Sequence, residues 1–222
     1  MECKRLFDCI EHQLQHFPQE DMLSAKENGQ WRKYSTKEVA QIANELSAGL
    51  LSLGLSANNF SPEGSDKIAI ISSNRPEWIF GDLAAQQLGL IWVPVYPTTN
   101  PLELTFILND ASVKYMFASS KELYDKVMSI KGKVDCLKEV YTFDRITGAK
   151  HWTELRNNDA SLLAQVEQIK KSIPVDQVTT FIYTSGTTGT PKGVMLTHKN
   201  IYFNLMMEKN HFHLMMHPTK KY

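Results

Sequence analysis

Apolar residues at helical spacing open the chain. Leu6, Ile10 and Leu14 lie four residues apart, which is the spacing of one helical face. Pro18 disfavours helical geometry at Phe17, the residue before it. We therefore expect an opening helix that ends near residue 17.

Two turn signals follow. Asn28-Gly29 lies between the segments 23–26 and 31–34 and supplies the positive φ angles of a two-residue hairpin, so a short β-hairpin is expected. Ser35 and Glu38 then form a capping-box pattern, followed by apolar residues on one helical face as far as Gly54. A helix is expected there, and the polar segment 56–66 after it reads as a surface loop.

From residue 67 onward, short apolar runs alternate with helical patterns. One helix is expected to begin at Asn74, and another is marked by the cap Asn100, the first-turn proline Pro101 and the acid Glu103. Strands are expected at 68–71, 90–93, 115–118 and 140–143, and a further helix at 159–171. This alternation indicates an α/β fold with a layered arrangement and flanking helices.

Composition and charge exclude several classes of protein. Hydrophobic residues make up 42% and charged residues 22%, a globular mix. The chain has 24 basic and 24 acidic residues, so it has no net positive charge that would attract it to nucleic acid. Cys3, Cys9 and Cys136 form no CxxC pair, which argues against a disulfide framework. No apolar run approaches the roughly 18 residues of a membrane span, so we expect a cytoplasmic protein, with peripheral contact at a membrane left open.

A segment rich in glycine and threonine follows a predicted buried strand at 179–183. From residue 184 to 193 it reads Thr-Ser-Gly-Thr-Thr-Gly-Thr-Pro-Lys-Gly. Glycines let the backbone N–H groups approach an anion, hydroxyls add donors, and Lys192 adds a positive charge. These groups suit the phosphates of a nucleoside triphosphate. The candidate nucleotide-binding residues are Thr184, Ser185, Gly186, Thr187, Thr188, Gly189 and Lys192.

Two other interpretations of this segment are weaker. A flexible surface connection rarely joins two strand-like runs, here 179–183 and 194–196, while carrying so many glycines and hydroxyls. A Walker loop of an ordinary nucleotide hydrolase needs Gly before its Lys and Ser or Thr after it, whereas Lys192 lies between Pro191 and Gly193. A helix is expected from Thr197, and His198 is expected to serve its first turn and not to act as a catalytic base.

The segment from Tyr183 to Val194 resembles the signature loop of the adenylate-forming (AMP-binding) superfamily, and 196–201 resembles the segment that follows it. Upstream, 71–78 and 93–98 resemble the corresponding parts of long-chain fatty acyl-CoA synthetases. The resemblance covers about residues 23–205. It implies a partial N-terminal domain of the acyl-CoA synthetase and luciferase-like fold.

The same resemblance implies a two-step ligation. A fatty carboxylate attacks the α-phosphate of ATP to give acyl-AMP and pyrophosphate, and the thiolate of coenzyme A then displaces AMP. Lys192 and the loop amides are implied to hold the β- and γ-phosphates, and the Thr184 hydroxyl to help coordinate Mg²⁺. Tyr183 is expected to finish the strand, the alternative being that it packs near the nucleotide, and no residue of this chain is assigned a catalytic role.

Family members are more than twice as long, and their adenine, ribose, acyl-tunnel and hinge motifs lie downstream of the loop. We therefore expect 1–207 to be a truncated AMP-binding N-terminal domain and 208–222 to be a divergent, frayed tail. His211, His213 and His217 in this tail lack the matching ligand set of a metal site. Such a fragment is expected to be inactive alone; the alternative is a noncatalytic module that binds a nucleotide or a partner protein.

Overall fold

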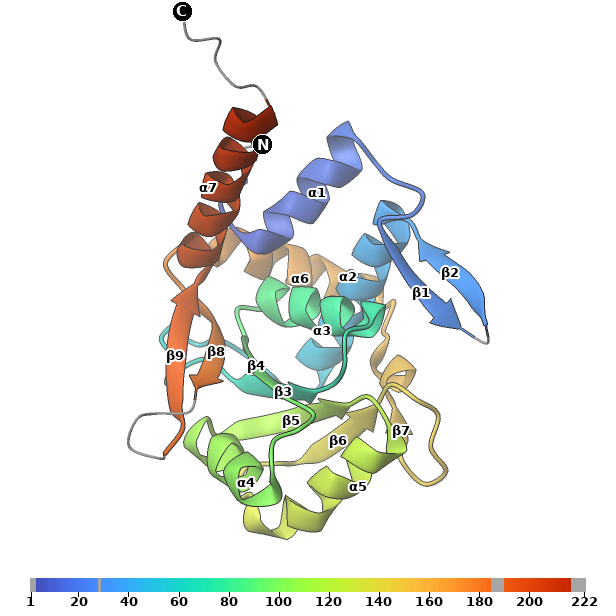
Figure 1. The fold of residues 1–222 in the computed structure, drawn as a ribbon, viewed down its shortest axis with the longest axis vertical. Coiled ribbons are helices and arrows are strands. Elements are labelled where there is room, and N and C mark those ends of the chain that lie inside the picture. Colours follow the sequence, from blue (N-terminus) through green and yellow to red (C-terminus); the bar gives the residue numbers. More distant parts are fainter. Residues whose placement is uncertain (1–2, 28, 185–189, 217–222) are drawn as a thin grey trace, which may run out of the picture.

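The computed structural model describes residues 3–27, 29–184 and 190–216, with side chains described as far as residue 207. Seven strands form one sheet in the order β7-β6-β5-β3-β4-β8-β9, and β1 and β2 form a separate hairpin (Figure 1). The sheet is parallel except for β9, which runs antiparallel to β8.

The strands are β1 (Leu23–Glu27), β2 (Gln30–Tyr34), β3 (Lys67–Ile71), β4 (Ile91–Val95), β5 (Val113–Ala118), β6 (Glu139–Thr142), β7 (Lys150–His151), β8 (Val178–Thr184) and β9 (Lys192–Thr197). The helices are α1 (Leu6–His16), α2 (Thr36–Ser52), α3 (Pro76–Gln87), α4 (Pro101–Asp110), α5 (Lys121–Ile130), α6 (Ala160–Ser172) and α7 (His198–Met216). Single 3₁₀ turns lie at Lys131–Lys133 and Trp152–Leu155.

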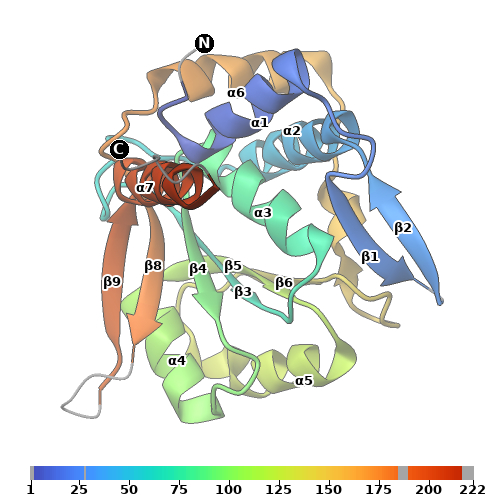
Figure 2. The ribbon, with the colours of Figure 1, turned by 45° about the horizontal axis from the view of Figure 1, so that its top comes forward.

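Two hydrophobic cores lie on opposite faces of the sheet. The helices α1, α2, α3 and α6 cover one face, and α4 and α5 cover the other (Figure 2). Along β3, Ile68 and Ile70 belong to the first core, whereas Ala69 and Ile71 belong to the second, as the two-residue period of a strand requires. The predicted layered α/β fold is confirmed.

The predicted elements near the N-terminus are confirmed. Helix α1 ends at His16, and the hairpin pairs Glu27 with Gln30 across residues 28 and 29, with Gly29 at φ +81°. Ser35 caps α2 by accepting a hydrogen bond from the Glu38 N–H. The Glu38 side chain does not complete the capping box, because its carboxylate pairs with Arg32 instead.

The start of α3 differs from the prediction. Its N-cap is Arg75 and not Asn74, because Pro76 takes the first helical position, where its missing N–H and fixed φ angle fit. The Arg75 side chain does not cap the helix but pairs with Glu77 and Asp144. Helix α5 and the two-residue strand β7 were not predicted.

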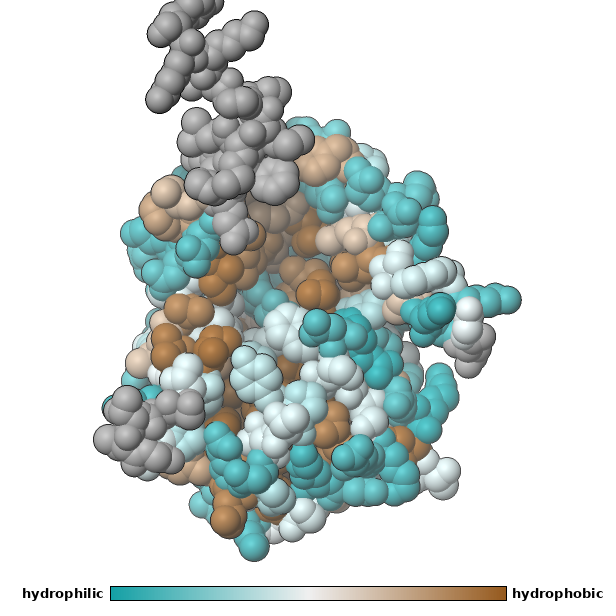
Figure 3. Space-filling view, in the orientation of Figure 1, coloured by the Kyte–Doolittle hydropathy of each residue, from teal (hydrophilic) through white to brown (hydrophobic). Residues whose placement is uncertain are grey.

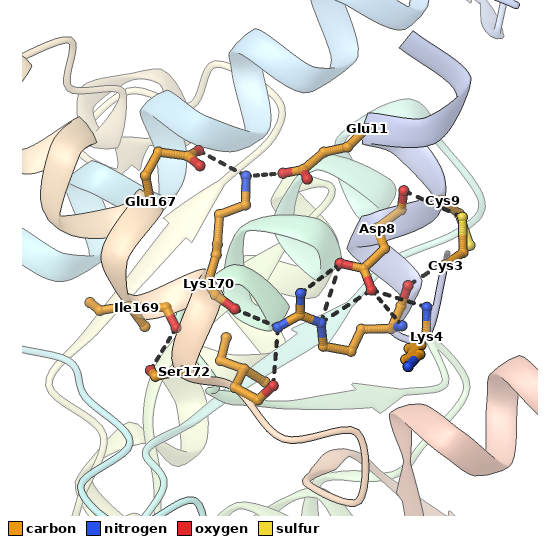
Figure 4. A network of polar contacts seen from close by, with 11 residues as sticks. Cys3, Lys4, Asp8, Cys9, Glu11, Glu167, Ile169, Lys170 and Ser172 are labelled. Carbon is orange, nitrogen blue, oxygen red and sulfur yellow. Dashed lines mark hydrogen bonds and ion pairs between the residues drawn. The ribbon is translucent and has the colours of Figure 1, made fainter. Parts of the chain in front are cut away.

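A polar network attaches α1 to α6 (Figure 4). The Arg5 guanidinium donates to the carbonyl oxygens of Lys170 and Ile173 and pairs with Asp8. The ammonium group of Lys170 in turn pairs with Glu11 and Glu167. These contacts satisfy the carbonyl groups at the end of α6.

Of the helices in the described ranges, none combines the length and apolar character needed to cross a membrane.

Candidate nucleotide-binding site

The predicted phosphate loop is the connection of the β8–β9 hairpin. Tyr183 pairs with Gly193 and Thr184 with Lys192, so the last residue of β8 lies beside the first residue of β9. Two antiparallel strands thus hold both ends of the connection, as expected for a segment between two strands and not for a Walker loop that opens into a helix.

The connected end of this hairpin is attached to helix α4 by Tyr183. The Tyr183 hydroxyl donates a hydrogen bond of 2.6 Å to the Asp110 carboxylate at the end of α4. Partial burial, together with this carboxylate, raises the pKa of the Tyr183 hydroxyl. A Cβ atom added at Gly193 would lie 3.1 Å from Cζ of Tyr183, so the glycine leaves room for the ring. Tyr183 therefore does more than finish the strand, which sequence reasoning missed.

A small hollow lies where β3, β4 and β8 end. It has a volume of about 210 Å³, and its lining includes Asn74 after β3, Tyr96 after β4 and Tyr183 at the end of β8. The carboxyl ends of neighbouring parallel strands are where α/β sheets commonly bind ligands. Tyr183, the residue before the predicted loop, thus lies beside a hollow at this end of the sheet.

The predicted loop residues fall into two groups. Thr184 and Lys192 are described, and both side chains are exposed at the connected end of the hairpin, on either side of the predicted loop. Within the part of the chain that the structure describes, Lys192 forms no ion pair, so its charge is available to a ligand. Ser185, Gly186, Thr187, Thr188 and Gly189 lie outside the described residues. Their predicted role in phosphate binding stays a prediction.

His198 packs in the core at the first position of α7. Its side chain is fully buried, its ring lies edge-on to Phe7 at 5.6 Å between centroids, and neither ring nitrogen has a hydrogen-bond partner among the described residues. Burial lowers the pKa of His198 to about 4, and the Arg5 charge adds to this effect. The predicted first-turn role is confirmed by the start of α7 at this residue.

Thr184 is the predicted protein ligand of Mg²⁺, and its side chain is exposed. The described residues contain no group of three or more His, Cys, Asp or Glu side chains able to hold a metal ion. Mg²⁺ that accompanies a nucleotide is held mainly by phosphate oxygens and water, so a site for it needs few protein ligands. The side chains of His211, His213 and His217 lie outside the described part.

Solved structures share this fold. A putative long-chain-fatty-acid CoA ligase from Rhodopseudomonas palustris superposes with a TM-score of 0.71 at 20% identity, over 90% of this chain and 46% of that chain. A red-emitting luciferase from Phrixothrix hirtus gives a TM-score of 0.69 at 20% identity, over 89% and 36%. The fold is that of the adenylate-forming enzymes.

Sequence comparison then gives the family. Residues 10–221 match the AMP-binding enzyme family, and the chain belongs to it. It is 30% identical over 200 residues to long-chain-fatty-acid–CoA ligase FadD15 of Mycobacterium tuberculosis, covering 86% of this chain and 30% of that protein. It is 29% identical over 190 residues to fatty acyl-CoA synthetase A of Dictyostelium discoideum, covering 82% and 27%. The chain therefore spans less than a third of the length of these relatives.

Proposed function

We propose that this chain provides the phosphate-binding part of an ATP-dependent long-chain fatty acid–CoA ligase. In the proposed reaction, an oxygen of the fatty carboxylate forms a bond to the α-phosphorus of ATP, and the bond to the bridging oxygen of pyrophosphate breaks. The sulfur of coenzyme A then attacks the acyl carbon of acyl-AMP and AMP leaves. A poor acyl donor is thus converted into a good one, since AMP is a far better leaving group than oxide.

The β8–β9 hairpin carries this proposal. Three observations support it: family membership, two relatives named as a fatty acyl-CoA synthetase and a long-chain-fatty-acid–CoA ligase, and the exposed Thr184–Lys192 pair at the connected end of the hairpin. In the proposal, Lys192 and the loop amides hold the β- and γ-phosphates and stabilise the charge that develops on pyrophosphate. The Thr184 hydroxyl is the proposed protein ligand of Mg²⁺, whose charge would reduce the repulsion between ATP and the attacking carboxylate.

The test is ATP binding by the Lys192→Ala variant. A hydrogen bond to a charged group contributes about 1.5–3 kcal/mol, so this change should weaken binding of Mg²⁺-ATP by about 10- to 100-fold in equilibrium dialysis. Lys199→Ala is the matched control, because Lys199 is also exposed but pairs with Asp176 at 3.3 Å. Equal affinities of the two variants would refute the role of Lys192.

Catalysis is tested separately by pyrophosphate exchange. With palmitate, ATP and Mg²⁺, this chain alone should give little exchange if catalysis needs the part of the relatives that the match does not cover. Robust exchange would contradict the expectation that the chain is inactive alone, while leaving the assignment of the phosphate loop intact.

A second candidate is a noncatalytic module that binds a partner protein. It is favoured by large apolar side chains that remain exposed on β9 and α7, including Met195 at 55%, Phe203 at 62% and Met207 at 53%. Exposed apolar groups that gather on neighbouring elements mark interaction surfaces. Saturable binding to a full-length fatty acyl-CoA ligase that survives Lys192→Ala would support this function, and loss of binding in that variant would count against it.

A further inference from the structure

A larger hollow lies between α3, the strands β4, β8 and β9, and the first turns of α7. Its volume is about 440 Å³, within the range of roughly 300–1,000 Å³ that is usual for small-molecule sites. Figure 3 shows hydrophobic side chains gathered in a depression on this face. Its lining is largely apolar and includes Trp78, Trp92, Pro94, Ile182, Leu196 and Ile201.

One carboxyl group, that of Asp82, lies in this apolar lining. Asp82 is in the middle of α3 and caps no helix end. Burial raises the pKa of its carboxyl to about 6, although a hydrogen bond from Gln86 acts in the opposite direction. No Lys or Arg of the described chain forms an ion pair with it. A carboxylate in such surroundings is costly unless a positive group compensates it.

Unused hydrogen-bond acceptors lie in the same lining. Among the residues that the structure describes, the amide oxygen of Gln86 and the hydroxyl of Thr179 have no hydrogen-bond partner, and both residues are about 1% exposed. Gln86 lies one turn after Asp82 on the same face of α3. The indole N–H of Trp92 is a buried donor that also lacks a partner within the described residues. The side-chain amides of Asn200 and Asn204 line the hollow as well, but both residues are exposed. Near the buried wall, the Asp82 carboxylate and the Gln86 amide oxygen can only accept and the Thr179 hydroxyl can accept, so this part of the hollow suits a ligand that donates.

We propose that this hollow binds a small amphiphile with a primary ammonium group. Such a group has three N–H donors, which match the Asp82 carboxylate, the Gln86 amide oxygen and the Thr179 hydroxyl in number and kind. The indole rings of Trp78 and Trp92, edge-to-face at 6.0 Å, add attraction for a cation. The apolar part of the ligand packs against Ile182 and Leu196.

This inference does not rest on the proposed function. Thr184 and Lys192, the predicted loop residues that the structure describes, do not line the larger hollow, although Trp78, Pro94 and Ile182 line both hollows. The ammonium site and the nucleotide site can therefore be separated by mutation. Trp78, at the boundary between the two hollows, provides a fluorescence signal for occupancy of the larger one.

The experiment compares three probes that have the same number of carbon atoms and differ in their polar group. n-Octylamine, 1-octanol and octanoate are titrated into the full chain at pH 7.5 while tryptophan fluorescence is followed. Octylamine should bind saturably and at least tenfold more tightly than octanol or octanoate. Asp82→Asn should remove this preference, and Thr179→Val should weaken octylamine binding severalfold. Lys192→Ala should leave it unchanged.

The matched control is Asp125→Asn, which removes an exposed carboxylate on α5 that pairs with Lys121. This variant should bind octylamine like the unmodified chain. The proposal is overturned if no probe binds saturably, which would mean that water alone satisfies the unpartnered groups. It is also overturned if octanoate binds as tightly as octylamine, or if folded Asp82→Asn and Thr179→Val variants both keep the preference.

Discussion

At the scale of single residues, the contact between Tyr183 and Asp110 joins two segments 73 positions apart in the sequence. The tyrosine lies one residue before the predicted phosphate loop, and the aspartate ends α4. Because Gly193 lies opposite the ring, the hairpin tolerates a large side chain at this position. The contact therefore sets where the loop begins relative to the sheet.

Removing the Tyr183 hydroxyl should cost stability through this contact. Tyr183→Phe is expected to lower the free energy of unfolding by about 1 kcal/mol, the usual net value of a hydrogen bond. Urea denaturation of this variant, of Asp110→Ala and of the double variant measures the coupling. If the two single effects simply add, the bond contributes nothing.

His198 should make the chain sensitive to acid. Its pKa is about 4 in the folded chain against an ordinary value of 6.5, so the unfolded chain binds the proton first. The stability linked to neutral His198 is present above pH 6.5 and is lost as the pH falls towards 4, by up to about 3 kcal/mol. His198→Leu should reduce this pH dependence in urea titrations at pH 7 and pH 5. His16→Gln, which replaces an exposed histidine, should leave this pH dependence unchanged.

At the scale of secondary structure, two asparagines predicted as helix caps differ. Asn100 accepts a hydrogen bond of 3.0 Å from the Glu103 N–H, whereas α3 starts at Arg75 without a side-chain cap. Asn100→Ala should therefore lower the free energy of unfolding by about 1 kcal/mol and Asn74→Ala by less than half of that. Chemical denaturation of both variants checks this, and equal losses would show that Asn74 stabilises α3 after all.

The sequence predicted elements wherever local chemistry determined them. Apolar spacing placed α1 and α2, and Asn28-Gly29 placed the β1–β2 hairpin. Helix α5 was missed, although Ser120 caps it by accepting from the Leu123 N–H. Strand β7 is two residues long and shows no periodicity of its own. Its place depends on pairing with β6, which is tertiary information.

The candidate site was predictable only in part. The loop was recognised because glycines, hydroxyls and a lysine are concentrated in ten positions. The Tyr183–Asp110 bond and the isolation of Asp82 were not, because both depend on which helices cover which strands. Chemistry concentrated in one segment can be read from a sequence, whereas contacts between distant segments need the fold.

At the scale of the whole molecule, close packing joins distant elements. A Cβ atom added at Gly49 in α2 would lie only 1.6 Å from the carbonyl oxygen of Leu155, whereas one at Gly132 would meet nothing within 4 Å. Gly49→Ala should therefore lower the free energy of unfolding by about 3 kcal/mol, at the upper end of ordinary overpacking costs. Gly132→Ala should change it by less than 1 kcal/mol in the same urea titration. Similar midpoints for both variants would contradict the packing of α2 against residues 152–155.

The two edge strands of the large sheet differ in length. Strand β7 forms one edge and has two residues, whereas β9 forms the other edge, has six residues and exposes Val194 and Met195. Among the described strands, β9 has a neighbour on one side only. A long apolar edge strand can pair with a strand of another molecule and so lead to fibrils or amorphous precipitate. A lysine substituted for Met195 should therefore delay turbidity in concentrated, gently heated solutions.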